Sequence, residues 1–175
     1  MKVIAVTGLI GSGKDEVARY LVKRHGFTLY DHSALLGEVL RKQGRPPTRE
    51  EKRKLRKERG PLFTARLIIQ KIREEQPARA VIGSLRRPEE IRLTRQAFPG
   101  TRLLLVKASP RVRFRRASHR ARDAPRDWVH FLEEERKEEK QFHFTETFRH
   151  ADFSVANNSS LRALQTQLDH IVERL

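Results

Sequence analysis

Short runs of apolar residues recur along the chain, each bounded by Gly, Pro or Asp, and segments with helical periodicity lie between them. Runs of this kind are typical of strands that are buried on both faces. Their alternation with helical segments predicts an α/β fold, with a parallel sheet and helices on both of its faces. The predicted strands are Lys2–Thr7, Phe27–Asp31, Ala80–Leu85, Arg102–Ala108 and Phe153–Ala156.

Start and stop signals add to the periodicity of the helical segments. Thr48 and Glu51 form a capping box that opens a strongly basic helix, and Gly60 ends it. The last helix carries Leu and Ile at alternating spacings of three and four, a stripe that we interpret as core packed on the sheet. The predicted helices are 14–25, 33–42, 48–59, 62–75, 88–98, 110–122, 127–141 and 161–175.

Residues 8–15 read Gly-Leu-Ile-Gly-Ser-Gly-Lys-Asp, directly between the first strand and the first helix. The G-x-x-x-x-G-K spacing at this place is that of a phosphate-binding loop, which disfavours a glycine-rich turn that binds nothing. Gly8, Gly11 and Gly13 let backbone N–H groups turn inward around a phosphate chain. The helix directs its positive end at the anion, and Lys14 can reach the β- and γ-phosphates. The loop therefore predicts a nucleoside triphosphate site.

One position of this loop departs from the pattern. The lysine is normally followed by a Ser or Thr whose hydroxyl binds Mg²⁺, and here the residue is Asp15. A carboxylate oxygen is also a ligand for Mg²⁺, although it adds negative charge beside the triphosphate. We therefore expect Asp15 to be the metal ligand, with Ser12 helping to position the ion.

Polar residues follow the second and third strands, at the sheet edge where open α/β folds bind ligands. Asp31 is a candidate for orienting or deprotonating an acceptor hydroxyl or for binding metal through water, and the alternative is an N-cap shared with Ser33. Arg86 and Arg87 can hold an acceptor phosphate through bidentate hydrogen bonds, and the alternative is surface charge at the start of a helix.

The segment after the fourth strand is rich in arginine. Arg113, Arg116 and Arg120 are spaced three and four apart, which predicts one stripe of guanidinium groups on the helix 110–122. A Pro-containing segment follows, so residues 111–127 are a candidate lid over the nucleotide, the alternative being a plain basic helix. Phosphoryl transfer requires neutralisation of developing negative charge. The candidate catalytic residues are therefore Lys14, Asp31, Arg86, Arg116 and Arg120.

The composition of the chain limits the classes of partner that it can bind. The 175 residues suit one domain, and the net charge of +16 indicates an anionic partner, either a nucleotide, a nucleic acid or a membrane surface. No stretch is long and apolar enough for a membrane span and no signal peptide is indicated, so a cytoplasmic protein is expected. The absence of cysteine excludes thiolate metal sites and a Cys nucleophile. Oligomeric state is left open.

The loop and the arginines together resemble the P-loop nucleoside monophosphate kinase-like proteins, most closely the dephospho-CoA kinase-like branch. The resemblance extends over nearly the full chain, from the residues 4–14 to the Asn157-Asn158-Ser159 segment. It implies a three-layer α/β/α fold, ATP with Mg²⁺, and transfer of the γ-phosphoryl group to a small phosphorylated acceptor covered by residues 33–75. By this resemblance Asn157 lies near the adenine. The expected nucleotide contacts are Gly8, Ile10, Gly11, Ser12, Gly13, Lys14, Asp15, Glu16, Arg116, Arg120 and Asn157.

Two further positions differ from that family. Gly83-Ser84 stands where relatives usually have Asp-Gly, and Gly37 replaces an arginine that often contacts the acceptor phosphate, a role that Arg41 can take. The exchange of carboxylates is compatible with a change of metal ligands or with a protein that binds nucleotide without transferring phosphate. An ATP-dependent small-molecule kinase is the first hypothesis. A nucleic-acid-binding P-loop NTPase or polynucleotide 5′-kinase is the second, because +16 exceeds what one nucleotide needs.

Overall fold

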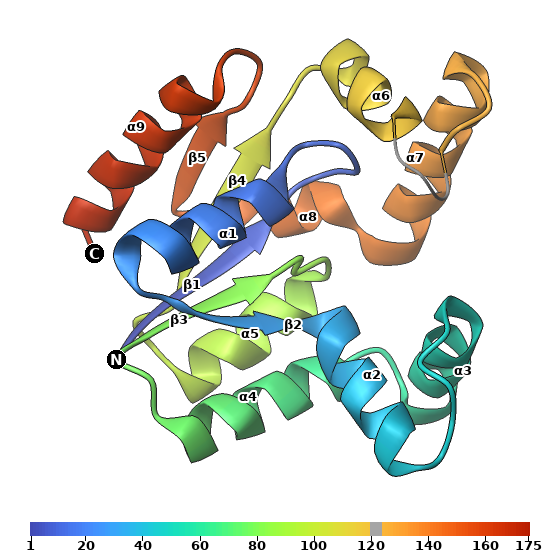
Figure 1. Cartoon of the computed structure of the whole chain (residues 1–175), viewed down its shortest axis with the longest axis vertical. Coiled ribbons are helices and arrows are strands. Elements are labelled where there is room, and N and C mark those ends of the chain that lie inside the picture. The colour runs from blue at the N-terminus through green and yellow to red at the C-terminus, as the bar shows by residue number, and fades with distance from the viewer. Residues whose placement is uncertain (120–123) are drawn as a thin grey trace.

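The computed structural model describes residues 1–119 and 124–175 (Figure 1). In this part of the chain five strands form one sheet in the order β2-β3-β1-β4-β5, and all neighbouring strands are parallel. The predicted α/β fold with a five-stranded parallel sheet is therefore confirmed. The strands are β1 (Lys2–Thr7), β2 (Thr28–Asp31), β3 (Arg79–Gly83), β4 (Arg102–Lys107) and β5 (Phe153–Ala156).

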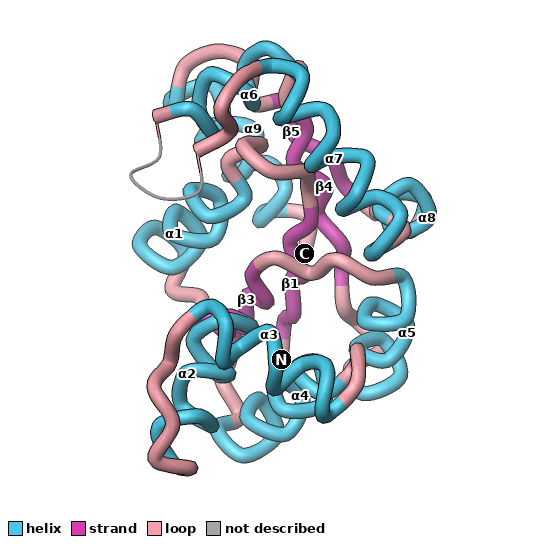
Figure 2. Tube along the Cα trace, turned by 90° about the vertical axis from the view of Figure 1, so that its right-hand side faces the viewer, coloured by secondary structure: helices cyan, strands magenta, loops and turns pink. Residues whose placement is uncertain are grey.

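Helices cover both faces of the sheet, which gives three layers (Figures 1 and 2). Helices α1 and α9 pack against one face, and α4 and α5 against the other. The helices are α1 (Lys14–His25), α2 (His32–Lys42), α3 (Arg49–Arg59), α4 (Phe63–Glu75), α5 (Pro88–Ala97), α6 (Pro110–Ser118), α7 (Trp128–Phe142), α8 (Phe144–Arg149) and α9 (Leu161–Glu173).

The side chains of β1 alternate between two cores, as the period of a strand requires. Ile4 and Val6 are buried with the helices α1 and α9, whereas Val3 and Ala5 are buried with α4 and α5. A third, smaller cluster joins α2 to α3 around Leu36, Leu40 and Leu55. Because β1 is buried on both faces, the loop that follows it starts from a rigid base.

Local signals explain most helix ends. Thr48 caps α3 through the N–H of Glu51, as the capping box predicts, and Ser109 caps α6 through the N–H of Val112. At the other end of α1, Gly26 takes a left-handed conformation with φ of 67°. The predicted third strand extended to Leu85, but β3 ends at Gly83 because Ser84 has φ of 60°.

Two segments differ from the expected helices. The arginine-rich helix ends at Ser118 within the described residues, and positions 120–122 of the prediction lie outside them. Helix α8 was not predicted. In it, Phe144 is buried, and its ring packs against those of the half-buried Phe142 and Phe148.

None of the described helices combines the length and the apolar character that crossing a bilayer requires.

Candidate functional site

The loop between β1 and α1 is pressed against two other parts of the chain. Gly11 has φ of 75°, and a Cβ on it would lie 2.4 Å from the backbone oxygen of Arg113 in α6. Gly13 has φ of 93°, and a Cβ there would lie 2.2 Å from Nδ2 of Asn157. Glycine is therefore required at both positions by conformation and by space. The loop keeps its shape because α6 and the end of β5 hold it from outside.

Asn157 connects the loop to an arginine. It is buried directly after β5, its Nδ2 donates to the carbonyl oxygen of Ser12 at 2.8 Å, and its Oδ1 accepts from Nη2 of Arg116 at 3.2 Å. Nη1 of Arg116 is buried and has no hydrogen-bond partner among the described residues, and it lies 3.9 Å from where a Cβ of Gly13 would be. A cationic donor without a partner beside a phosphate-binding loop fits an anion.

Burial, together with the neighbouring Arg115, lowers the pKa of Arg116. The cost of desolvating this guanidinium is one that a bound phosphate would offset. The sequence predicted Arg116 and Asn157 as nucleotide contacts. In the structure Asn157 supports the loop from behind, and Arg116 is held beside it.

The start of α1 carries the residues expected to meet phosphate and metal. Oδ1 of Asp15 accepts a hydrogen bond from the Ser84 hydroxyl at 3.5 Å, so the residue in place of the usual Ser or Thr faces the end of β3. The hydroxyl of Ser12 is buried beneath Gly8, and among the described residues it has no hydrogen-bond partner. The role of Ser12 in positioning Mg²⁺ stays a prediction. Glu16 pairs with Arg19 at 2.6 Å on the helix surface.

The side chains near the loop can be compared with the ligands that Mg²⁺ requires. In residues 1–119 and 124–175 no three His, Asp or Glu side chains come together as a ready-made metal cage. Mg²⁺ in nucleotide enzymes is normally held by one or two carboxylates and by substrate phosphates, with water completing its shell. Asp15, next to the loop, fits that sparse arrangement.

The two carboxylate oxygens of Asp31, at the end of β2, have different surroundings. Its Oδ1 accepts the N–H of Ala34 at 2.8 Å and caps α2, which was the alternative interpretation of this residue. Its Oδ2 lies 3.7 Å from where a Cβ of Gly83 would be, because Asp31 and Gly83 are paired in the sheet. The missing side chain at 83 leaves this carboxylate oxygen open toward the end of β3.

Similarity to known proteins agrees with this architecture. A family model described as an AAA domain matches residues 4–143. A UPF0200 protein from Pyrococcus horikoshii is 31% identical over 182 residues, covering 99% of this chain and 97% of that protein. The chain belongs to the UPF0200 and AAA domain families. A UPF0200 protein from Thermococcus gammatolerans is 32% identical, with 99% and 95% of the two chains covered.

Solved structures share the fold of this UPF0200 protein at low sequence identity. The shikimate kinase from Bacteroides thetaiotaomicron has a TM-score of 0.67 at 13% identity and covers 98% of this chain and 97% of its own. TT1252 from Thermus thermophilus has a TM-score of 0.66 at 21% identity, covering 99% and 97%. A gluconokinase from Sinorhizobium meliloti has a TM-score of 0.60 at 17% identity, covering 99% and 94%. The fold is thus that of P-loop kinases.

Arg86 of the UPF0200 chain is held by α7. Its guanidinium lies 4.9 Å from the centre of the Phe142 ring and 3.7 Å from a carboxylate oxygen of Glu138. The turn that carries it is fixed by Glu90, which accepts the backbone N–H groups of Arg86 and Arg87 at 2.8 and 3.0 Å. Both the backbone and the side chain of Arg86 are therefore held in place, and its role toward an acceptor stays a prediction.

Arg56 and His32 are two candidate residues that sequence reasoning missed. The side chain of Arg56 in α3 is exposed, yet enough protein surrounds its guanidinium to lower its pKa, and the charge of Arg86 lowers it further. The charges of Glu90 and Asp31 act on the pKa of Arg56 in the opposite direction. In the sequence Arg56 is one of many basic residues in its helix, and only the protein and the charges around its guanidinium group distinguish it.

His32 is buried, with 8% of its surface exposed, at the start of α2. Its Nδ1 lies 3.0 Å from the Thr64 hydroxyl, and its Nε2 is buried without a partner among the described residues. Burial lowers the pKa of His32 below the ordinary 6.5, so the ring is neutral at neutral pH. In the sequence, only the position of His32 next to Asp31 could have identified it as a candidate site residue.

The neutral His32 predicts a pH dependence of stability. As the pH falls through 6.5, the His32 ring is protonated in the unfolded chain but stays neutral in the folded chain, where its pKa is lower. The free energy of unfolding therefore decreases. This contribution is complete above pH 6.5 and is lost below it. Urea unfolding of wild type and His32→Asn on both sides of that pH tests the prediction: the variant has the shallower acid dependence, and equal slopes contradict the assignment.

Arg113 does not join the predicted arginine stripe. Its side chain is 5% exposed and forms an ion pair with Glu135 of α7, and its Nε donates to the carbonyl oxygen of Ala108 at 3.0 Å. Ala117 of the same helix is also buried. Arg120, the third member of the stripe and a predicted catalytic residue, lies outside the described residues.

The buried pair of Arg113 and Glu135 predicts strong coupling between α6 and α7. Glu135→Leu leaves the guanidinium without its counter-charge and is expected to lower the free energy of unfolding by about 3–5 kcal/mol. Adding Arg113→Met removes the orphaned charge, so the double variant is expected to recover most of the loss. Chemical denaturation of the wild type, of the single variants Glu135→Leu and Arg113→Met and of the double variant measures this coupling. Additive effects of the two substitutions would contradict the coupling.

Arg41, the expected replacement for an arginine at 37, lies in a suitable place. Its Nη2 is 3.4 Å from where a Cβ of Gly37 would be. The guanidinium therefore reaches the point from which a longer side chain at 37 would start. The acceptor role of Arg41 stays a prediction.

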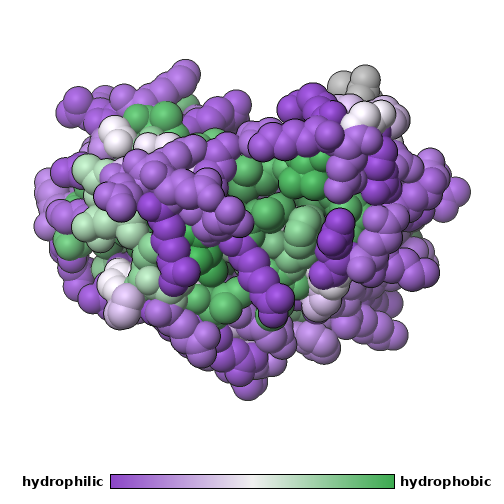
Figure 3. All heavy atoms as spheres, turned by 90° about the horizontal axis from the view of Figure 1, so that it is seen from below, coloured by the Kyte–Doolittle hydropathy of each residue, from purple (hydrophilic) through white to green (hydrophobic). Residues whose placement is uncertain are grey.

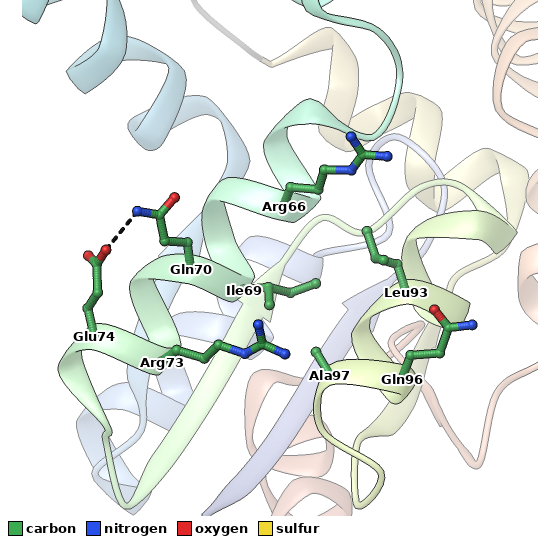
Figure 4. A pocket seen from close by; sticks show the side chains of 8 residues that line it. All are labelled: Arg66, Ile69, Gln70, Arg73, Glu74, Leu93, Gln96 and Ala97. Carbon is green, nitrogen blue, oxygen red and sulfur yellow. Dashed lines mark hydrogen bonds between the residues drawn. The ribbon is translucent and has the colours of Figure 1, made fainter.

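A hollow of about 640 Å³ lies elsewhere, between α4 and α5 (Figure 4). Ile69, Leu93 and Ala97 form its apolar part, and Arg66 and Arg73 reach over it from α4. The view of the molecule from below shows exposed apolar atoms among a surrounding majority of polar ones (Figure 3). None of the residues that line it belongs to the loop or to the strand ends, so this hollow is separate from the candidate site.

Proposed function

We propose that this protein is an ATP-dependent phosphotransferase that acts on a small phosphorylated acceptor. The observation that carries the proposal is Nη1 of Arg116, which is buried beside Gly13 and has no partner among residues 1–119 and 124–175, in a loop whose glycine conformations match a phosphate cradle. A structural loop would have no use for a desolvated guanidinium at this point. Catalysis of phosphoryl transfer depends mainly on such positioned charges.

The roles follow from position. Lys14 and the first backbone N–H groups of α1 hold the β- and γ-phosphates, and Arg116 stabilises the negative charge that develops on the transferred group. Asp31 orients the attacking oxygen of the acceptor as the new P–O bond forms and the bond to the β-phosphate oxygen breaks, and where that oxygen belongs to a hydroxyl group, Asp31 takes its proton. Mg²⁺, when bound with ATP, neutralises charge on the phosphates, and Asp15 is the protein group that would hold it.

The acceptor side is formed by α2 to α4 and by the turn after β3. We assign residues 33–75 to covering the acceptor and residues 111–127, of which 120–123 are outside the described structure, to a lid over ATP. Arg86 and Arg56 are the cations that would bind the acceptor anion. A nucleoside or deoxynucleoside monophosphate, or dephospho-CoA, is the class of acceptor that the resemblance to nucleoside monophosphate kinase-like proteins favours. The fold neighbours are named for shikimate and gluconate kinases, so these two acids belong in the same panel.

A coupled assay of ADP release tests the proposal. Purified protein with ATP and Mg²⁺ is offered nucleoside monophosphates, deoxynucleoside monophosphates, dephospho-CoA, shikimate and gluconate one at a time. We expect one acceptor class to raise turnover far above the rate with ATP alone. ATP binding with no stimulation by any acceptor would count against a small-molecule kinase.

A polynucleotide 5′-end is the second candidate acceptor, because the basic residues of α3 are largely exposed next to Arg56. Arg49, Arg53, Lys57 and Arg59 each expose a large part of their side chains. Binding through backbone phosphates would weaken steeply with salt, with log K falling by about 0.7–0.9 per phosphate contact for each decade of salt. Titration of single-stranded oligonucleotides at several salt concentrations decides this case, since salt-independent binding excludes it.

A further inference from the structure

One nitrogen of His32 is satisfied and the other is not. Nδ1 lies 3.0 Å from the hydroxyl of Thr64 in α4, whereas Nε2 is buried and has no partner among the described residues. Only 8% of the surface of His32 is exposed, so bulk water cannot supply a partner freely. An unpaired polar atom at such a place costs about 1–3 kcal/mol and calls for an explanation.

The surroundings of His32 indicate what could pair with it. The two ring nitrogens point in different directions, so Nε2 is turned away from Thr64. The charges close enough to act on the ring are those of Glu90, Asp31, Arg86 and Arg56. Of these, Asp31, Arg86 and Arg56 are the groups that we assign to the acceptor.

We infer that Nε2 of His32 forms a hydrogen bond with the bound acceptor and is a specificity-determining residue for it. The inference rests on the proposed phosphotransferase function and deepens it by defining the acceptor. The acceptor is a small anion for Arg56 and Arg86 that also carries a neutral hydrogen-bonding group, a hydroxyl or an amide, near that anion. His32 is neutral, so it selects for the group and does not add to the charge that binds the anion.

With this assignment, the contact between His32 and Thr64 orients the ring for the acceptor. If the Thr64 hydroxyl donates to Nδ1, the proton of the ring is on Nε2, which then donates to the acceptor. If Nδ1–H donates to Thr64, Nε2 accepts from a hydroxyl or N–H of the acceptor. In both cases Thr64 fixes the ring, and loss of the partner group from the acceptor leaves a buried nitrogen unpaired, which is how polar sites reject analogues.

Two substitutions separate this role from a purely structural one. In His32→Asn the side-chain amide reaches the position of Nδ1, so the contact with Thr64 can persist while the Nε2 position is empty. In His32→Gln the amide reaches the position of Nε2 instead. A structural role through Thr64 predicts that Asn is the better replacement, and an acceptor role predicts that Gln is.

The measurement uses the best acceptor of the wild type and analogues that each lack one hydroxyl or amino group, such as AMP, 2′-deoxy-AMP and purine riboside 5′-monophosphate if a nucleotide is preferred. We expect wild type to discriminate against one analogue by about 10- to 100-fold in kcat/KM. His32→Asn is expected to lose that discrimination with the KM for ATP unchanged, and His32→Gln to keep most of it. Discrimination that survives in His32→Asn would overturn the inference.

A binding readout keeps the test independent of turnover and of the folding of the variants. In the wild type, the Nε2 nitrogen of His32 is followed by NMR while the same acceptors are added, with the exposed His170 as the control. A shift of His32 alone supports the inference, even for an acceptor that is bound without being phosphorylated. Saturable acceptor binding with no change at His32 overturns it, whereas absent turnover with ATP bound counts against the phosphotransferase proposal alone.

Discussion

Lys14→Met is expected to lower acceptor-stimulated ATP turnover by about 10²–10³-fold, the range found when one charge-stabilising donor is removed from a transition state. Lys14 begins α1 directly after the glycine loop, so its ammonium group acts on the phosphates together with the helix end. Methionine keeps a long apolar stem at this position and removes the charge. Steady-state kinetics with saturating ATP and acceptor measures the loss in kcat.

The control for this substitution is Lys23→Met in the last turn of the same helix, where the side chain is exposed and far along the helix from the loop. It removes the same charge from the molecule and is expected to leave kcat unchanged. If both variants lose activity equally, the general charge of the protein is responsible and the assigned role of Lys14 is wrong.

Gly11→Ala is expected to abolish tight ATP binding and to destabilise the fold by about 2–4 kcal/mol. A Cβ at this position would lie 2.4 Å from the backbone oxygen of Arg113, and a backbone atom cannot move aside as a side chain can. The left-handed conformation, with φ of 75°, adds its own penalty for alanine. Calorimetric titration with ATP and chemical denaturation measure the two effects.

Two other glycines provide matched controls for the Gly11 substitution. Gly26 has φ of 67° with open space around its Cβ position, so alanine there carries only the conformational penalty of about 1–2 kcal/mol. Gly100 has open space and no left-handed conformation, and alanine is expected to be neutral. A Gly11 variant no worse than the Gly26 variant would show that contact with α6 does not shape the loop.

The sequence was sufficient for features that depend on local pattern. The apolar runs identified the strands, the spacing of Gly8, Gly11, Gly13 and Lys14 identified the loop, and Thr48 with Glu51 identified the start of α3. Each of these depends on residues close together in the chain. The end of β3 was predicted less well. Its apolar pattern continues to Leu85, but the left-handed backbone of Ser84 ends the strand earlier.

Features that depend on distant partners were not accessible from the sequence. Helical spacing placed Arg113 with Arg116, but Glu135, 22 positions further along, draws Arg113 into a buried pair. Likewise, Arg56 is distinguished from its basic neighbours only by the protein packed around it, and Thr64 is 32 positions away from His32. Periodicity indicates which face of a helix a residue occupies, but it does not indicate which residue from elsewhere in the chain contacts that face.

The support that Asn157 gives to the loop has a practical consequence for anyone shortening this chain. The AAA domain match ends at residue 143, before β5 and before Asn157. A fragment trimmed to that boundary would lose the carboxamide that fastens Ser12 and Arg116, and it would leave the hydrogen-bonding edge of β4 unprotected. Such a fragment should aggregate and lose its affinity for ATP, so the boundary drawn by homology is narrower than the unit that folds.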